Sequence, residues 1–488
     1  MSERLAFGYG TARRGGEAPA RAAVRVEPAP AAQAPAAIAG EEKETKRDWA
    51  FFGLLAFTAV LYFRPQDQIP GMSAVPFAEL SALLGLTAMV VGRLARGLAF
   101  TRVTPELIGV AALGFVILAT APFSVWPGGA VGTFTDVFVK VLLIFTLMVN
   151  TLTTIERLHR FMTVVVIATG YLATRAVFDY LRGFNLVENG RVQGAVGGMF
   201  QNPNDLALNM VALLPLALLV ALHAKTTWGR LGAAFLGLMM VGAVIVSYSR
   251  GGFVGLAVMV LILGLQLARR RPAAVGTAAI LLLFALPFAP SSYWERVSSI
   301  TDDSRDATGS REARRILLRE AWDTFLAFPF HGVGAGQFQN YNPPGRIEIW
   351  RETHNVLLQV AAELGIFGLA AFGYLLWRAL TAGRATRRLL RRASGSSPPK
   401  PWQSPRAAEP AVVSPEQASY LDAHAGAMTA AIVGWFICAL FASVAYAWTF
   451  YYLLALAAAP RDILAGRLAA RSAAAKRAAV PHLAEARV

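Results

Sequence analysis

The sequence predicts an all-α protein that crosses a membrane many times. Of its 488 residues, 55% are hydrophobic and only 16% carry a charge, and the mean hydropathy is +0.47. The charged residues gather between apolar runs of about 20 residues, which is the length that an α-helix needs to cross the hydrocarbon core of a bilayer. These observations exclude a soluble domain of this size.

About twelve spans fill most of the chain between residues 49 and 464. They are expected at 49–64, 75–92, 104–122, 131–150, 158–179, 204–223, 230–248, 251–268, 273–289, 354–379, 427–447 and 448–464. The first nine thus occupy 49–289, and the last three occupy 354–464. The tail at 1–48 is rich in Ala, Pro and Arg and has no apolar core, so we expect it to be disordered.

Basic residues predict how the chain is oriented. Every even-numbered span is followed by a basic loop, as at Arg93, Arg157 and Arg269. Cytoplasmic loops carry such an excess of Lys and Arg, so we expect the tails at 1–48 and 465–488 in the cytoplasm. The formal net charge of +16 is therefore explained without a nucleic-acid partner.

Two long polar segments interrupt the apolar runs. Residues 290–353 lie between the ninth and tenth spans and are expected to form a large external loop, which the family resemblance described below places in the periplasm. The loop is close to neutral, and long loops are translocated largely regardless of charge. Residues 393–419 contain the run SGSSPPKPWQSP and are expected to form a disordered cytoplasmic linker.

The run SREARRILLREAWDTF in the large loop predicts an amphipathic helix. Arg311, Arg315 and Arg319 follow i, i+4 spacing, and Arg314 lies beside Arg311. Like charges at this spacing repel one another. Either nearby acids such as Glu312 or a bound polyanion must therefore offset them, and the spacing leaves both interpretations open.

Two histidines, His331 and His354, are expected on the external side. His354 lies where the large loop meets the tenth span, at the start of a helix. A histidine at this place is able to titrate near neutral pH and to act as a general base. The structural alternative is a histidine that only begins the helix or lies at the membrane interface.

Even-numbered spans begin on the external side, so their N-terminal N–H groups and dipoles favour bound anions there. The sixth span begins with FQNPND, in which Asn202 or Asn204 caps the helix and Pro203 suits its first turn. The eighth begins after SYSRGG, which places Arg250 at the lipid–water boundary. A charge at that depth is a functional candidate, and the alternative is that Arg250 snorkels to the interface.

Several kinds of chemistry have no support in the sequence. The single cysteine, Cys438, lies in an apolar run, which argues against a disulfide framework and a cysteine metal site. The external acids and histidines lack ligand spacing such as HExxH, so neither a metal nor another cofactor is expected. The glycines of HGVGAGQF allow close backbone approach, but the run lacks the lysine and strand of a nucleotide-binding loop.

Four motifs, in the same order, resemble those of the O-antigen ligase family. They are GRVQGAVGGMFQNPNDLA, VSYSRGGFVGL, SREARRILLREAW with FPFHGVGAGQF, and THNVLLQVAAELGIFG. The resemblance covers roughly residues 105–460 and is strongest at 190–370. The earlier run FRPQDQIPG is similar to a subgroup associated with exopolysaccharide and exosortase systems.

The resemblance implies a metal-independent glycosyltransferase of the GT-C type in the bacterial inner membrane, with its active site on the periplasmic face. It implies transfer of a glycan from undecaprenyl diphosphate to a hydroxyl of lipid A–core, another glycan or a protein. Ligase, polymerase and protein O-oligosaccharyltransferase remain open, and the long loop favours a ligase. A transporter of a lipid-linked anion is the alternative from another class, because it would use the same arginines without chemistry at His354.

The resemblance also implies roles for single residues. His354 corresponds to the catalytic histidine that deprotonates the acceptor hydroxyl, and Arg250 to an arginine that contacts the diphosphate. Arg314 is the best match to a catalytic loop arginine, although Leu318 replaces a tryptophan often found four residues after it, which leaves Arg311 and Arg315 as alternatives. The residues expected to bind substrate are Arg191, Asn202, Asn204, Arg311, Arg315 and Asn355.

Overall fold

The computed structural model describes residues 48–72, 75–187, 190–197, 200–268, 310–394 and 411–485. Within these ranges, nine helices are long and apolar enough to cross a membrane. This confirms the prediction of an all-α polytopic membrane protein. The span expected at 273–289 lies outside the described residues.

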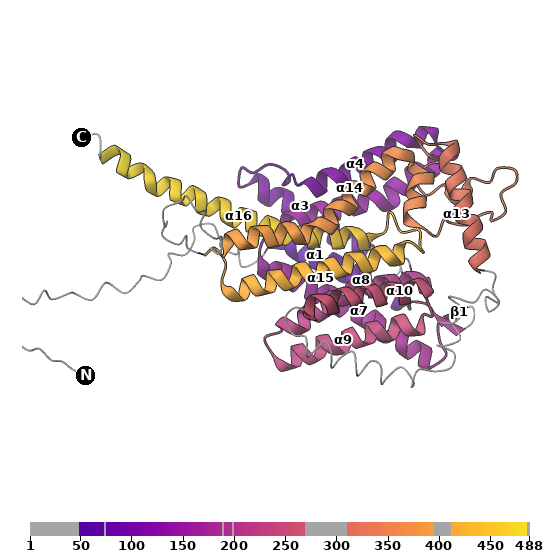
Figure 1. Cartoon of the computed structure of the whole chain (residues 1–488), viewed down its shortest axis with the longest axis horizontal. Helices are drawn as coiled ribbons and strands as arrows, with labels where there is room; N and C mark the ends of the chain where they lie inside the picture. Colours follow the sequence, from indigo (N-terminus) through magenta and orange to yellow (C-terminus); the bar gives the residue numbers. More distant parts are fainter. Residues whose placement is uncertain are drawn as a thin grey trace, which may run out of the picture. The chain divides into compact units, whose positions relative to one another are not determined.

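Long helices make up most of the described chain (Figure 1). They are α1 (Trp49–Phe63), α3 (Phe77–Leu94), α4 (Pro105–Thr120), α6 (Val139–Thr151), α7 (Ile155–Leu181), α8 (Pro203–His223), α9 (Thr227–Val246), α10 (Arg250–Ala268), α13 (Ser310–Ala327), α14 (Val356–Ala393), α15 (Pro415–Ala439) and α16 (Trp448–Glu485). The short elements between them are α2 (Pro65–Gln68), η1 (Ala121–Phe123), α5 (Pro127–Gly132), η2 (Thr133–Phe138), β1 (Leu186–Val187), β2 (Arg191–Val192) and η7 (Phe338–Asn340). Strands β1 and β2 pair in antiparallel fashion.

Many helices begin at a polar residue that accepts the free N–H groups of the first turn. Thr104, Thr154 and Thr226 do so for α4, α7 and α9. Ser414 and Gln417 form a reciprocal capping box at the start of α15. This cap places the start of α15 at Pro415, inside the stretch expected as linker and well before residue 427, where the apolar run begins.

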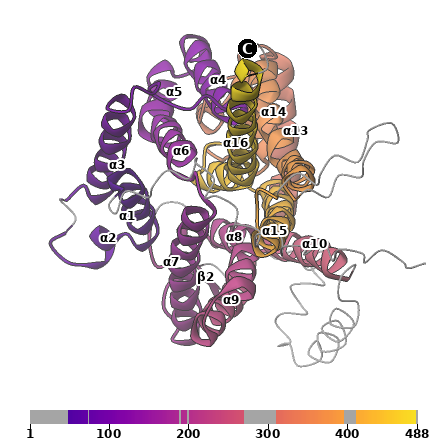
Figure 2. The same ribbon diagram turned by 90° about the vertical axis from the view of Figure 1, so that its left-hand side faces the viewer.

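Two groups of helices form the bundle. Viewed along the helices, α4, α6, α14 and α16 gather on one side, and α7, α8 and α9 on the other (Figure 2). Helix α8 packs against α7, α9 and α15, and α14 packs against α4, α15 and α16. Between them, Trp435 of α15 stacks on Phe450 of α16 with the ring centroids 4.7 Å apart. The core therefore lies around α8, α14 and α15.

A buried ionic cluster joins three helices. Glu106, in the first turn of α4, is 1% exposed. Its carboxylate accepts hydrogen bonds from Arg378 of α14 (2.7 Å) and from Arg461 of α16 (2.6 Å). Arg461 also pairs with Asp462 at 2.7 Å. Because a buried carboxylate is costly unless it is paired and hydrogen-bonded, this cluster fixes the second half of α14 against α4 and α16.

Helix α14 is broken near its beginning. Gly365 has φ 63° and ψ −158°, which is not a helical conformation. The carbonyl groups freed by the break are used by the glycine-rich turn, defined here as residues 331–338. The N–H of Val333 donates to the carbonyl of Ala362 (2.9 Å), and the N–H of Gly334 donates to that of Glu363 (2.8 Å). The turn therefore completes the backbone hydrogen bonding that α14 loses.

Glycine is required where this turn touches the break. Gly332 has a φ of 66°, and a Cβ added there would overlap the backbone of Glu363. A Cβ on Gly365 would lie 2.6 Å from the carbonyl carbon of Phe330. These contacts confirm that the glycines of HGVGAGQF allow close backbone approach, and they explain the run as a packing device.

Replacing Gly332 with alanine is expected to lower the free energy of unfolding by about 2–4 kcal/mol, because it adds both a clash and a left-handed alanine. Gly345→Ala is the matched control. Gly345 also has a positive φ (89°), but nothing lies within 4 Å of a Cβ added there, so about 1 kcal/mol is expected. Unfolding of both variants in one detergent measures the difference. Equal losses would show that backbone conformation alone requires the glycine.

Candidate functional site

Helices α8, α10 and α14 begin at the end of the bundle where α13 lies (Figure 1). The end of α15 and the connection between α15 and α16, residues 440–447, contact two of these starts. Cys438, near the end of α15, has its Sγ 3.5 Å from the carbonyl of Gly251 in α10. The Nδ2 of Asn355, before α14, donates to the carbonyl of Leu440 (3.2 Å). We call this region the His354 end.

Several predicted residues form one hydrogen-bonded cluster at the start of α8. The Nη2 of Arg191 donates to Asn204 Oδ1 (2.8 Å), and its Nε donates to the carbonyl of Ser247 (3.1 Å). Ser249 Oγ also donates to Asn204 Oδ1 (2.9 Å). The structure thus brings Arg191 and Asn204 to the turn that immediately precedes Arg250, the first residue of α10.

The two asparagines of FQNPND have different tasks. Asn202 is exposed and caps α8, since its Oδ1 accepts the N–H of Asn204 at 2.8 Å. The side chain of Asn204 instead connects Arg191 with Ser249. The sequence left open which asparagine caps the helix, and the structure assigns the cap to Asn202.

His354 is held through its backbone by Ser443. The N–H of His354 donates to Ser443 Oγ (3.0 Å), which shares a second hydrogen bond with Thr353 Oγ1 (3.0 Å). His354 has a φ of 49°, which is uncommon for a residue other than glycine. Asn355 then caps α14 by accepting the N–H groups of Leu357 and Leu358, both at 3.0 Å. These contacts fix the backbone that carries the imidazole.

Glu363 links the residues behind His354. Its carboxylate, buried in α14, accepts the N–H of Gly336 in the glycine-rich turn (2.8 Å) and the hydroxyl of Tyr446 (2.9 Å). Gln359, one turn earlier, accepts the N–H of Ala445 (3.0 Å). The connection 440–447 is therefore fixed to α14 on one side and holds His354 on the other.

Burial and neighbouring charges make His354 a neutral group at pH 7. Burial lowers its pKa to about 4, and the positive charges of Arg314 and Arg351 act in the same direction. The surrounding protein raises the pKa of Glu352, while a hydrogen bond from Ser443 opposes this rise. Arg314, on α13, therefore lies within electrostatic reach of the imidazole.

The carboxylate of Glu352, two residues before His354, acts on the start of α8. It acts electrostatically on Asp205, which lies in the first turn of α8. Like charges at such sites disfavour each other. The His354 end thus contains acids as well as arginines.

The arginines of α13 do not share one environment. Helix α13 forms where the sequence predicts an amphipathic helix, with Leu317 fully buried beneath it. Arg314 is half-buried, whereas Arg315 is exposed and pairs with Glu312 at 3.6 Å. The side chain of Arg311 lies outside the described part of the structure. Among the described arginines of α13, Arg314 is thus the one whose charge acts on His354.

Arg346 lies at the centre of the loop that leads to His354 and holds it together. Its side chain is 3% exposed and lies 3.5 Å from Glu320. It donates to the carbonyls of Phe338 (2.6 Å), Tyr341 and Arg351 (3.1 Å), and its guanidinium lies 4.2 Å from the centre of the Phe338 ring. Burial lowers its pKa, which Glu320 partly offsets. Arg346 therefore has a structural role, which could not be predicted from the presence of an arginine in the sequence.

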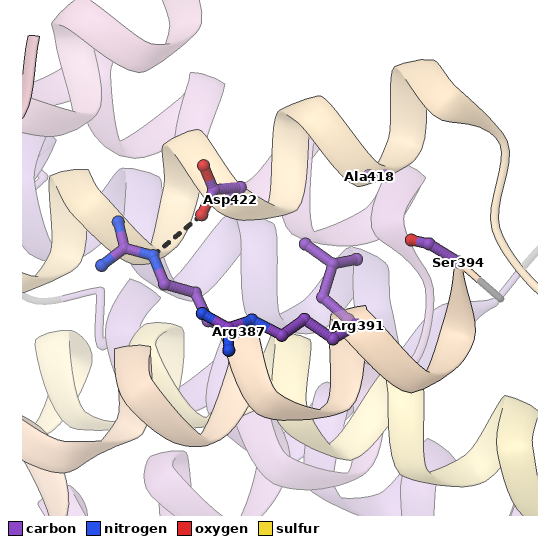
Figure 3. A pocket seen from close by; sticks show the side chains of 6 residues that line it. Arg387, Arg391, Ser394, Ala418 and Asp422 are labelled. Atoms are coloured by element: carbon purple, nitrogen blue, oxygen red, sulfur yellow. Dashed lines mark hydrogen bonds and ion pairs between the residues drawn. The ribbon is translucent and has the colours of Figure 1, made fainter. Parts of the chain in front are cut away.

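A cavity of about 240 Å³ lies elsewhere, between the last part of α14 and the first part of α15 (Figure 3). Its lining residues are Arg387, Leu390, Arg391, Ser394, Ala418 and Asp422. Arg387 Nε donates to Asp422 Oδ1 (2.8 Å) across it. None of the predicted site residues lines this cavity. In the part of the chain that the structure describes, no group of three or more His, Cys, Asp or Glu is placed to hold a metal ion.

The fold and the site define an α-helical polytopic membrane protein with a neutral histidine and several arginines at one end of its bundle. Residues 234–373 match the model of the O-antigen ligase family. This range includes Arg250, Arg314 and His354, whereas Arg191, Asn202 and Asn204 precede it. The match supports the resemblance to this family that the four motifs indicate.

One curated relative resembles a similar length of the chain. The teichuronic acid biosynthesis protein TuaE of Bacillus subtilis (strain 168) is 33% identical over 139 residues. The match covers 26% of this chain and 28% of the relative. It therefore spans less than a third of either protein, and it too supports the O-antigen ligase family.

Ser443→Ala is expected to loosen the backbone at His354, because the N–H of His354 loses its acceptor. Hydrogen exchange of the peptide that contains residues 352–356 should become roughly ten- to a hundredfold faster. Ser81→Ala is the control, since among the described residues Ser81 Oγ donates only to carbonyls of its own helix, α3. Unchanged exchange at His354 in the Ser443 variant would contradict the positioning role.

Proposed function

We propose that this protein transfers a glycan from undecaprenyl diphosphate to an acceptor hydroxyl at the His354 end. The observation that carries the proposal is a half-buried histidine, neutral at pH 7, within electrostatic reach of two arginines and at the same end of the bundle as the starts of α8 and α10. The match to the O-antigen ligase family supports a membrane enzyme that joins or extends glycans. The protein acts as a glycosyltransferase in this proposal, and it uses no metal or other cofactor.

His354 is the general base in this proposal. A neutral imidazole is able to accept the proton of the acceptor hydroxyl, but a pKa of about 4 makes it a weak base at pH 7. A diphosphate beside Arg314 and Arg351 would offset the charges that lower this pKa. Donor binding would therefore raise the basicity of His354 at the moment when the acceptor must be deprotonated.

The diphosphate binds arginines and helix starts. Arg250 is the first residue of α10, where N–H groups and the helix dipole favour an anion. Arg191 and Asn204 form the adjoining cluster, and a guanidinium suits two diphosphate oxygens at once. Stabilising the leaving diphosphate lowers the barrier to breaking its bond to the sugar. Arg314, on α13, adds a further positive charge that stabilises the diphosphate.

The His354 end faces the periplasm in this proposal, and both termini are in the cytoplasm of a bacterium whose inner membrane holds the protein. The acceptor is lipid A–core, another glycan or a protein, with ligation favoured by the long loop. The relative's part in teichuronic acid biosynthesis supports polysaccharide extension as the second candidate. A transporter that moves a lipid-linked glycan without chemistry is the alternative class.

Purified protein in lipid nanodiscs, given an undecaprenyl-diphosphate-linked glycan and an acceptor, should release undecaprenyl diphosphate only when the acceptor is present. His354→Ala is expected to lower kcat at least about a hundredfold, since it removes the general base. Arg250→Ala should lower kcat/KM by roughly the same factor, because a developing charge loses a donor.

His223→Ala, at the opposite end of α8, is the control for the loss of a histidine. Full turnover by His354→Ala would exclude His354 as the general base. A wild-type protein that moves the donor across liposomes without releasing diphosphate would favour the transporter.

The pH profile tests the charge on α13. Only neutral His354 is active, so kcat/KM should fall as the pH drops through its pKa of about 4. Arg314→Gln removes a positive charge that lowers this pKa, so the acid limb should move toward pH 6.5. Arg319→Gln, exposed on the same helix, should leave it in place. An acid limb unmoved by Arg314→Gln would show that this charge does not act on the base.

A further inference from the structure

Three apolar side chains are exposed in the loop just before His354. Ile347, Ile349 and Trp350 are 68%, 53% and 67% exposed. They lie between η7 and α14, outside the helices that are apolar enough to cross a membrane. Charged neighbours, Glu348 and Arg351, alternate with them. Exposed apolar groups with a polar rim commonly mark a binding surface.

This loop is held firmly although its apolar side chains point outward. Glu320 Oε1 accepts the N–H groups of Ile347 (2.7 Å) and Glu348 (3.3 Å), and buried Arg346 donates to the carbonyls of Glu348 and Arg351. The N–H of Trp350 donates to Asn342 Oδ1 (3.3 Å). Trp350 has a φ of 60°, which is strained for a bulky residue. Strain of this kind persists where the surrounding contacts impose it, and it gathers at ligand sites.

The surroundings of Trp350 favour a sugar ring over a lipid or a protein. Insertion of this loop into the hydrocarbon core of a bilayer would carry Glu348 and Arg351, which pair at 3.2 Å, into the apolar phase at high cost. Three side chains are also far fewer than the roughly 20 residues a side of a stable protein interface. A pyranose has one face of C–H groups with hydroxyls around its edge, which matches an indole with charged neighbours.

Trp350 also lies at a suitable distance from the histidine. Four residues of chain span at most about 14 Å, so the Cα of Trp350 lies within that distance of the Cα of His354. A saccharide of two or three rings would bridge this gap. A ring on Trp350 would therefore belong to the same molecule that presents a hydroxyl to His354.

We propose that Trp350 is a sugar-binding platform for the acceptor glycan, on which the C–H face of a pyranose ring packs while Glu348 and Arg351 contact its hydroxyls. The negative face of the indole attracts the slightly positive C–H groups. The proposal rests on the proposed function, since it names where the acceptor lies. It assigns to the exposed loop a role in holding the acceptor, apart from the binding of the diphosphate and the deprotonation by His354.

Binding is tested without turnover by ¹⁹F NMR of protein labelled with 5-fluorotryptophan in nanodiscs. The resonance of Trp350, one of ten tryptophans, is identified by its loss in Trp350→Phe. The probes are methyl α-glucopyranoside, lactose and maltotriose at roughly millimolar concentration. A saturable shift at Trp350, without a shift at Trp228 (84% exposed, at the start of α9), is expected for at least one probe. No shift with any probe would overturn the proposal.

Spin-labelled lipid in the same nanodiscs tests whether Trp350 contacts lipid instead of a sugar. Broadening of the Trp350 resonance by this lipid would show that the loop enters the bilayer, and it would overturn the proposal.

In the transfer assay, Trp350→Ala should raise KM for the acceptor roughly three- to tenfold with kcat within a factor of two. Trp350→Tyr should recover most of the affinity, and Trp228→Ala should leave KM unchanged. A loss of kcat alone would mean that Trp350 only supports the fold.

Discussion

The break in α14 is the constraint on which the His354 end depends. An unbroken helix would satisfy its own carbonyls and leave no place for the glycine-rich turn to bind. Because Gly365 leaves the helical conformation, the turn is able to pair with Ala362 and Glu363. The Glu363 carboxylate then ties this turn to Tyr446. The loop, the first turns of α14 and the connection 440–447 are thus one hydrogen-bonded unit, with His354 at its edge.

Charge is distributed differently at the two ends of the bundle. Glu106 is neutralised by two guanidinium groups, a closed arrangement that favours stability over binding. At the His354 end, Arg314 and Arg351 act on an imidazole that is itself neutral, and Arg351 also pairs with Glu348. Sites that handle charged substrates commonly combine perturbed titratable groups in this way. The same residue type therefore serves packing at one end and chemistry, in our proposal, at the other.

Local signals in the sequence predicted the helical class, the amphipathic helix α13 and the candidate positions of His354 and Arg250. Apolar runs and caps need only neighbouring residues, so they are visible without a fold. The apolar run after residue 427 gave no sign that α15 begins at Pro415, because its first turns are polar. Ser443 lies 89 residues from His354, and no spacing rule connects residues so far apart. The structural role of Arg346 was equally hidden, because it depends on the burial of the side chain, which the sequence does not show.

The ionic cluster at Glu106 has a consequence for motion in the protein. It holds the segment of α14 beyond Gly365 against two other helices, so this longer segment is fixed within the bundle. The shorter segment begins at Val356, directly after His354. Along the chain, Gly365 joins the two segments. Hinges of this kind absorb backbone rotation at a few residues. Any rocking of the histidine relative to the membrane helices must therefore be taken up at Gly365 and in the turn that packs against it.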